Sequence, residues 1–301
     1  MSTTPLEIAA SANQARQRIR RHIYQTPVIP ARKTGIKHSA KVFFKAENFQ
    51  LTGSFKLRGA MSKISNYTGS KPLITASSGN HGIGSAQAAS TLHKSLTVVL
   101  PETVVSSKLK KIESFGVEVI LDGPEAGQAE QHAQKLAASG EYTYVSPYND
   151  PDIVAGQATI GLEILEQCDH VDNVFVSMGG GGLISGIGSV LKAFSPGTKV
   201  FGVAATNSKT LAESIVAGKI IETDHLPTLA EGVAGGIDED SITLPLASVV
   251  VDQVIEFEGS AGLALAGFDK VAHQLGAQTS IILMCVANID ANTIREVLYG
   301  S

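Results

Sequence analysis

The strongest constraint on the fold of this chain is a regular alternation between short apolar runs and longer helix-like runs. Helix-like periodicity falls at residues 83–92, 106–115, 126–138, 153–167 and 183–194. The apolar runs predict strands at residues 42–44, 73–75, 96–100, 117–121, 142–145, 174–177, 200–203, 248–251 and 281–284. Strands that alternate with helices form βαβ units, in which the strands are mostly parallel. The sequence therefore predicts an α/β protein.

The composition is that of a folded protein with a sizeable core. Hydrophobic residues make up 43% of the 301 positions and the net charge is −4, unlike the composition of disordered chains. The length favours two domains. There is no clustered basic face for nucleic acid, no membrane-spanning run, no signal peptide and no metal-ligand spacing. We expect no metal, no nucleic-acid or membrane partner, and a cytoplasmic location in which Cys168 and Cys285 are free.

Four consecutive glycines, Gly179 to Gly182, directly follow the predicted strand 174–177 and open the helix-like run 183–194. Glycine lets the backbone approach an anion closely at a helix N-terminus. A tight strand-to-helix turn would also explain the run, but a phosphate-binding loop is favoured. The spacing fits neither the dinucleotide-binding motif nor the P-loop.

Three further segments carry candidate chemistry. Residues 75–82, Thr-Ala-Ser-Ser-Gly-Asn-His-Gly, would either bind a carboxylate through backbone amides or simply cap a helix. Lys56 has apolar neighbours, which favour the lowered pKa of a Schiff-base lysine, although most lysines are surface residues. Cys285 and Asn288 follow a predicted strand at the end where α/β sheets bind ligands, although a free cysteine is more commonly a small buried hydrophobe.

In their order and separations these segments resemble the fold-type II pyridoxal-phosphate (PLP) enzymes, in particular the serine/threonine dehydratase and serine racemase family. The resemblance runs from Gln25 to Asn288, is most specific over residues 47–60, and includes residues 146–151 and 156–160. It implies two α/β domains with open, mostly parallel twisted sheets, similar to the tryptophan synthase β fold, with PLP in the cleft between them. The large PLP-binding domain would comprise residues 1–69 and 148–301, and a small mobile domain residues 70–147.

The resemblance also implies residue roles. Lys56 would bind PLP covalently and act as the base at the substrate α-carbon. The cofactor would further contact Phe55 beside its ring, Asn80 at its 3′-oxygen, Cys285 at its pyridine nitrogen and Glu258 near the ring. Its phosphate would be bound by the backbone amides of Gly179, Gly180, Gly181, Gly182 and Leu183. The substrate carboxylate would be held by Ser77, Ser78, Gly79, Asn80 and His81.

The implied activity is that of a PLP-dependent ammonia-lyase, or dehydratase. It would convert a β-hydroxy amino acid such as L-threonine or L-serine into the 2-keto acid and ammonia by α,β-elimination. Because a thiol has no charge to stabilise a protonated pyridine nitrogen, Cys285 favours prompt loss of the β-hydroxyl group. An amino-acid racemase and a non-catalytic phosphate-ligand binding protein are the alternatives. A homodimer is expected from the resemblance alone.

The chain departs from the family pattern at several places. Cys285-Val286-Ala287 stands where a hydroxyl residue followed by two glycines is usual. At the position of Ser78 racemases also have serine, whereas many dehydratases have alanine. The Ser78 hydroxyl could reprotonate the opposite face of the α-carbon. Residues 126–133 contain no arginine where mammalian-type racemases carry one. No acidic residue follows Gly202-Val203 directly, so the divalent cation site of those racemases is predicted to be absent.

Overall fold

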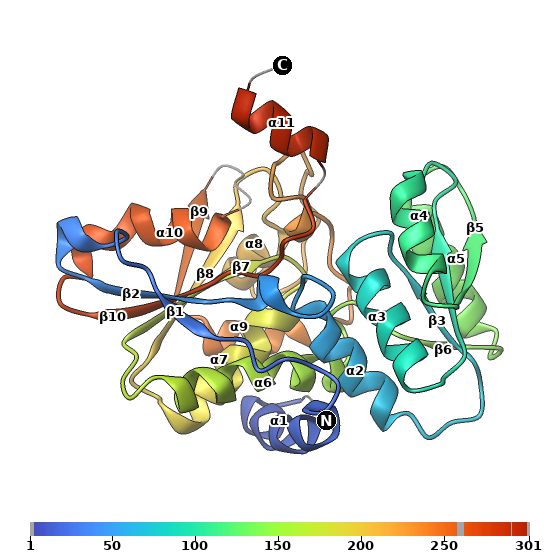
Figure 1. Ribbon diagram of the computed structural model, residues 1–301, viewed down its shortest axis with the longest axis horizontal. Helices are drawn as coiled ribbons and strands as arrows, with labels where there is room; N and C mark the ends of the chain where they lie inside the picture. Colours follow the sequence, from blue (N-terminus) through green and yellow to red (C-terminus); the bar gives the residue numbers. More distant parts are fainter. Residues whose placement is uncertain (1–2, 258–261, 290, 300–301) are drawn as a thin grey trace.

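Two β-sheets organise the computed structural model, which describes residues 3–257, 262–289 and 291–299 (Figure 1). The larger sheet has the order β1-β2-β10-β7-β8-β9 and the smaller one the order β5-β4-β3-β6. The strands are β1 (Val28–Pro30), β2 (Lys41–Lys45), β3 (Leu73–Ala76), β4 (Leu96–Leu100), β5 (Glu118–Leu121), β6 (Thr143–Tyr144), β7 (Asn173–Met178), β8 (Lys199–Ala205), β9 (Gln253–Phe257) and β10 (Thr279–Leu283). Among these strands only β1 and β2 pair antiparallel.

Helices cover both sheets and fill the space between them. They are α1 (Pro5–Ile19), α2 (Lys56–Asn66), α3 (Asn80–Thr91), α4 (Ser106–Glu113), α5 (Ala126–Ala138), α6 (Pro151–Gln167), α7 (Gly182–Phe194), α8 (Thr210–Ala217), α9 (Thr243–Val250), α10 (Leu263–Val271) and α11 (Ala291–Tyr299). Short 3₁₀ turns lie at Ile36–His38, Glu47–Phe49, Glu231–Val233 and Ala272–Gln274. Figure 1 shows α2 and α3 between the two sheets.

The smaller sheet is covered on both faces. Leu73 and Val98 pack into one apolar cluster with α2 and α3, whereas Ile74 and Val99 pack into another with α5. Successive residues of a strand point to opposite faces, so this split requires two covered faces. The five residues of β4 are all buried, as the continuous apolar run at 96–100 predicts for a parallel strand.

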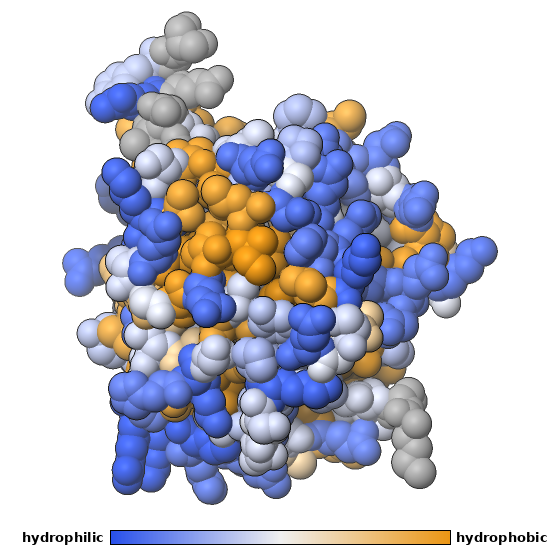
Figure 2. All heavy atoms as spheres, turned by 90° about the vertical axis from the view of Figure 1, so that its right-hand side faces the viewer, coloured by the Kyte–Doolittle hydropathy of each residue, from blue (hydrophilic) through white to orange (hydrophobic). Residues whose placement is uncertain are grey.

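Elements of the small sheet all fall within the span predicted for the small domain. The four strands β3 to β6 and the helices α3, α4 and α5 lie between Leu73 and Tyr144. Figure 2 shows an apolar patch, surrounded by polar side chains, on the side of the molecule where these elements lie. The division at residues 70–147 and the mobility of this domain stay predictions of the sequence.

The predicted strand at 248–251 is wrong, because most of these residues end helix α9. Leu244, Ala247 and Val250 are buried and lie three residues apart, which places them on one helix face. The β-branched run at its end favours a strand locally, but packing of this face overrides that preference. The strand of this region, β9, begins at Gln253. Strand β1, which has only three residues, is not among the predicted strands.

A network of four charged side chains is buried where β2, α2 and α6 meet. The Arg58 guanidinium contacts Glu47 at 2.8 Å and Glu163 at 2.6 Å, and the Lys45 ammonium contacts Glu163 at 2.6 Å. The Thr26 hydroxyl donates to Glu47. Burial alone would lower the pKa of Arg58, but the two carboxylates outweigh it and raise that pKa. The two cations and two anions balance, which is what makes their burial tolerable.

Close backbone contacts fix the start of α2 between its neighbours. A Cβ atom at Gly156 in α6 would lie 2.5 Å from the carbonyl oxygen of Arg58. A Cβ atom at Gly84 in α3 would lie 3.1 Å from the backbone nitrogen of Leu57. Glycine is therefore needed at Gly156, and a side chain at Gly84 would have to push the start of α2 away by a few tenths of an ångström. The first turn of α2 is thus closely packed between two other helices.

We expect Arg58→Met to destabilise the protein strongly, because it leaves two buried carboxylates without their shared cation. The expected loss is about 3–5 kcal/mol in the free energy of unfolding, measured by urea denaturation with circular dichroism. The matched control is Arg16→Met, which removes a partly exposed pair with Glu166 and should cost less than about 1 kcal/mol. Equal losses in the two variants would contradict the structural role given to the buried network.

Candidate active site

The predicted site segments converge at the carboxyl ends of strands from both sheets. Residues 77–79 follow β3, residues 179–181 follow β7 and residues 284–289 follow β10. The backbone just before Lys56 pairs with the segment after β10, through Phe55 N–H to the Cys285 carbonyl at 3.2 Å and Ala287 N–H to the Gly53 carbonyl at 2.8 Å. This edge is where α/β sheets bind ligands.

Lys56 begins helix α2 and has the environment of a reactive amine. Its Nζ donates a hydrogen bond to the Pro147 carbonyl at 2.9 Å and lies 5.5 Å from the centre of the Phe55 ring. Burial lowers the pKa of Lys56 from 10.5 to about 8, although the nearby Glu130 and Cys285 act in the opposite direction. A desolvated lysine with a lowered pKa is suited to Schiff-base formation.

The glycine loop packs so tightly that side chains would not fit in it. A Cβ atom would lie 2.8 Å from the Val233 carbonyl at Gly179 and 2.5 Å from the Tyr148 ring at Gly180. Gly181 has a φ of +86°, which favours glycine. Gly182 and Leu183 then begin α7, whose first N–H groups have no acceptor within the helix. Bare amides at a helix N-terminus fit a phosphate group.

The loop after β3 makes a tight turn into α3. The Ser77 hydroxyl accepts a hydrogen bond from the Gly79 N–H at 3.1 Å, and a Cβ atom at Gly82 would collide with the Ser77 carbonyl. Ser77, Ser78, Gly79 and Asn80 are all partly exposed. Their placement at the first turn of α3 suits a carboxylate ligand.

His81 points away from the other residues of this loop. Its Nε2 lies 3.0 Å from the Thr75 hydroxyl and 3.0 Å from the Val145 carbonyl, and the side chain is buried. Burial and the nearby Lys56 lower the pKa of His81 to about 3, so the imidazole is neutral. Any contribution of His81 to carboxylate binding would come from its backbone N–H rather than from its ring.

Cys285 lies beyond β10, with its Sγ 3.7 Å from the Leu283 carbonyl. Burial raises the pKa of Cys285 to about 12, although hydrogen bonding with Ser177 opposes this. The thiol is therefore protonated at neutral pH, which fits an uncharged partner for a ring nitrogen. Glu258, predicted to lie near the ring, falls outside the described residues.

Glu130, Tyr144, Tyr148 and Asp238, to which the sequence assigned no role, lie in the surroundings of Lys56. Tyr144 donates to the Glu130 carboxylate at 3.1 Å, and the Asp238 N–H donates to the Tyr148 hydroxyl at 2.9 Å. Burial, and to a lesser degree Asp238, raises the pKa of Glu130, while Lys56 lowers it. Glu130 lies within a helix, and nothing in its local sequence distinguishes it from a solvent-exposed carboxylate.

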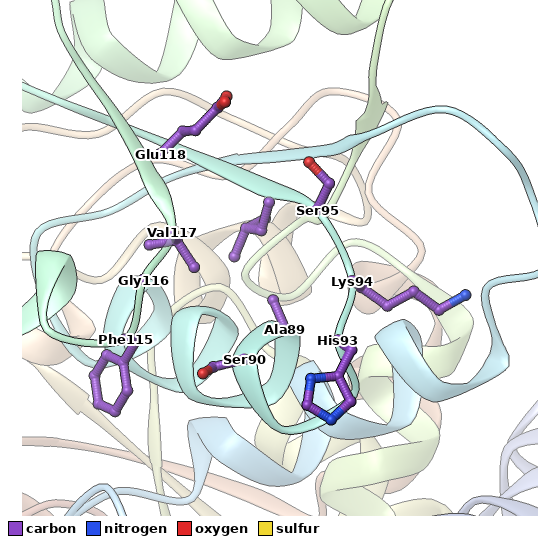
Figure 3. A pocket seen from close by; sticks show the side chains of 10 residues that line it. Ala89, Ser90, His93, Lys94, Ser95, Phe115, Gly116, Val117 and Glu118 are labelled. Carbon is purple, nitrogen blue, oxygen red and sulfur yellow. The ribbon is translucent and has the colours of Figure 1, made fainter.

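The pocket shown in Figure 3 lies elsewhere. It has a volume of about 340 Å³ and is lined by residues at the amino ends of β4 and β5, including Leu96 and Glu118. This is the sheet edge opposite to the predicted site segments. Across the described part of the chain, no three His, Cys, Asp or Glu side chains cluster in a way that could hold a metal ion.

A family model described as "Pyridoxal-phosphate dependent enzyme" matches residues 19–267. The chain therefore belongs to the pyridoxal-phosphate dependent enzymes. The α/β fold, with one mostly parallel sheet and one parallel sheet, agrees with that family, so the predicted fold class and the predicted cofactor are confirmed.

Within the family the relatives are of the predicted kind. The chain is 34% identical over 281 residues to an L-threonine ammonia-lyase of Thermotoga maritima, covering 86% of this chain and 70% of the relative. It is 32% identical over 296 residues to a biosynthetic L-threonine dehydratase of Pasteurella multocida, covering 90% of this chain. It spans only 58% of the length of that dehydratase.

Solved structures similar to this chain include a threonine deaminase and a serine racemase. Threonine deaminase isoform 2 from Solanum lycopersicum matches with a TM-score of 0.91 at 27% identity, covering 97% of this chain and 87% of that one. Maize serine racemase matches with a TM-score of 0.87 at 28% identity, covering 97% and 96%. The resemblance to the serine/threonine dehydratase and serine racemase branch is thus confirmed.

We expect the Lys56 amine to become nucleophilic near pH 8. Its reaction rate with an amine-reactive reagent should rise through pH 8 and level off above it, because only the neutral amine reacts. Peptide mass spectrometry of the apoprotein labelled between pH 6 and 11 measures this rate, with the exposed Lys37 as the reference in the same digest. A midpoint near 10.5, the ordinary value for lysine, would contradict the desolvated environment.

Proposed function

We propose that this chain is a PLP-dependent ammonia-lyase that converts a β-hydroxy amino acid into the 2-keto acid and ammonia. The observation that carries the proposal is Lys56, a lysine with a pKa near 8 at a site formed by the ends of β3, β7 and β10. Relatives named threonine ammonia-lyase and threonine dehydratase, at 32–37% identity, support it.

The residues present fit the cofactor. Lys56 would bind it covalently, the amides of Gly179 to Leu183 would hold its phosphate, and Asn80 and Cys285 would contact the ring oxygen and ring nitrogen. When bound, PLP withdraws electrons from the α-carbon of an amino acid, which makes its proton acidic. The glycine loop has no room for side chains, so its amides can reach a phosphate directly.

The side chains of this site suit an elimination. The Lys56 amine, neutral above about pH 8, can accept the α-proton of the substrate. The loop of Ser77, Ser78 and Gly79 would hold the substrate carboxylate and so orient the α-carbon toward Lys56. The β-carbon then loses its hydroxyl group as water, and a second water molecule releases ammonia and leaves the 2-keto acid. The neutral Cys285 thiol favours this prompt loss.

Glu130 and Asp238 support a substrate whose side chain is uncharged. Burial raises the pKa of Tyr144 and of Tyr148, and the negative charges of Glu130 and Asp238 raise both further. The charge of Glu130 also raises the pKa of Lys56. A negatively charged substrate side chain placed near these two carboxylates would be repelled by them. L-Threonine or L-serine would therefore be preferred to 3-hydroxyaspartate, although one relative at 37% identity is named L-threo-3-hydroxyaspartate ammonia-lyase.

An amino-acid racemase is the second candidate. Ser78 supports it, because this hydroxyl residue lies in the same loop as Asn80 and is partly exposed, so it could return a proton to the α-carbon. Serine racemases are also among the structural neighbours.

The proposal extends to the oligomeric state and the location of the protein. A homodimer rests on the family resemblance, and a cytoplasmic location rests on the two free cysteines. Within the described residues, no helix has both the length and the apolar character that crossing a membrane requires.

We expect the PLP-loaded protein to release 2-keto acid from L-threonine or L-serine, and Lys56→Ala to reduce this rate by at least about a thousandfold. The keto acid is measured by coupled reduction with a dehydrogenase. Lys71→Ala, an exposed lysine away from the site, is the control and should keep wild-type activity.

Inversion of L-serine to D-serine without keto acid would favour the racemase instead. A protein that binds no PLP would contradict both enzymatic proposals and leave a phosphate-ligand binding protein.

We expect Glu130→Gln to relax discrimination against an acidic side chain. The ratio of kcat/KM for L-threo-3-hydroxyaspartate to that for L-threonine should rise about tenfold, because a negative charge is removed from the substrate's surroundings. Glu141→Gln, an exposed carboxylate of the same region, should leave the ratio unchanged. A wild-type preference for 3-hydroxyaspartate would show that the two carboxylates do not face the substrate.

A further inference from the structure

Asn288 ties three separate segments together beside the predicted cofactor residues. Its Nδ2 donates one hydrogen bond to the Thr52 carbonyl at 2.8 Å and another to the Asn80 Oδ1 at 2.7 Å. Thr52 precedes Lys56 in the loop before α2, Asn80 begins α3, and Asn288 itself follows β10. These hydrogen bonds therefore link the two loops of the larger-sheet part to the first residue of a small-sheet helix.

The orientation of both amides follows from the Thr52 carbonyl. A backbone carbonyl can only accept, so the Asn288 atom that faces it must be the NH₂ group. The same NH₂ group has a second hydrogen, and the Asn80 atom that receives it must be the amide oxygen. Asn80 is therefore left with its own NH₂ group, for which the described ranges 3–257, 262–289 and 291–299 offer no acceptor within hydrogen-bonding distance.

Gly53 makes room for this arrangement. It has a φ of +72°, and a Cβ atom there would lie 2.9 Å from the Asn288 Oδ1 and 3.2 Å from its Nδ2. The residue after Thr52 thus has both the left-handed backbone and the missing side chain that allow the Asn288 amide to approach. The backbone conformation at Gly53 therefore matches the position of the Asn288 side chain.

We propose that Asn288 is a positioning residue that fixes the Asn80 amide so that its NH₂ group, and not its oxygen, is presented to the ring oxygen of PLP. The inference rests on the proposed function, because it needs PLP as the acceptor. Without Asn288 the Asn80 amide can turn over, since its two ends have nearly the same shape. With Asn288 present, a flipped Asn80 would place two NH₂ groups against each other.

The test compares an isosteric substitution, Asn288→Asp, with removal of the amide side chain in Asn288→Ala. In Asn288→Asp the introduced carboxylate accepts only, so Asn80 turns its NH₂ group toward it and presents its oxygen to the oxygen of the cofactor. In Asn288→Ala the Asn80 amide is free and can still choose the favourable orientation. We expect the dissociation constant of PLP to rise about tenfold in Asn288→Asp and no more than about threefold in Asn288→Ala.

A second readout does not depend on turnover. The pH at which the visible absorption band of the holoenzyme changes should move up by about one unit in Asn288→Asp, because the donor that stabilises charge on the ring oxygen is replaced by an acceptor. Asn207→Asp is the matched control. Asn207 also donates through Nδ2 to a backbone carbonyl, that of Pro227 at 2.8 Å, and its replacement by aspartate introduces the same charge. It should leave both measurements unchanged.

A double variant separates the effect of the Asn80 amide orientation from the effect of the charge that Asn288→Asp introduces. In the background of Asn80→Ala, changing Asn288 to Asp should alter the dissociation constant of PLP by less than about twofold, because no amide is left to flip. A tenfold effect that persists in this background would overturn the inference, and so would a larger effect for Asn288→Ala than for Asn288→Asp. If the wild-type protein binds no PLP, the proposed function fails instead, and the two failures are distinguished.

Discussion

The buried pairing of Arg58 with Glu47 and Glu163 is the interaction on which the site depends. Arg58 lies two residues after Lys56 in α2, and its two carboxylate partners come from the segment after β2 and from α6. An ion pair in a dry interior tolerates little displacement, because the buried charges compensate one another only at close contact. The first turn of α2 is thereby fixed to the larger sheet and to α6. The reactive amine is placed by this network rather than by its own contacts, of which the Pro147 carbonyl is the main one.

The polar groups around this amine are mostly held without charge. The His81 ring is neutral because it is buried, the Cys285 thiol keeps its proton, and the Lys56 amine titrates near pH 8. A phosphate and a carboxylate, if bound here, would be met by backbone dipoles at the starts of α7 and α3 rather than by fixed cations. Such dipoles stabilise charge without needing to reorganise when the charge changes.

Sequence patterns were informative where backbone conformation or strand period decides the structure. The continuous apolar run at 96–100 is a buried strand, and the four glycines at 179–182 form a strand-to-helix loop with no space for a side chain. They were not informative where tertiary packing decides. The run 248–251 favours a strand locally, yet most of it packs as a helix. Neither the burial of the His81 ring nor the approach of Glu130 to Lys56 has a local signature, because both depend on segments far away in the sequence.

Glycine at the helix crossings has a mechanical consequence. At Gly156 and Gly84 the backbones of α6 and α3 touch the first turn of α2 with no side chains between them. Flexible side chains at a crossing can change rotamer and absorb small movements of one helix against another, but bare backbones cannot. Any displacement of α3, which carries Asn80, is therefore passed directly to the backbone of Lys56. Because the first turn of α2 is itself fixed to the larger sheet and to α6, the predicted movement of residues 70–147 would have to leave this contact in place.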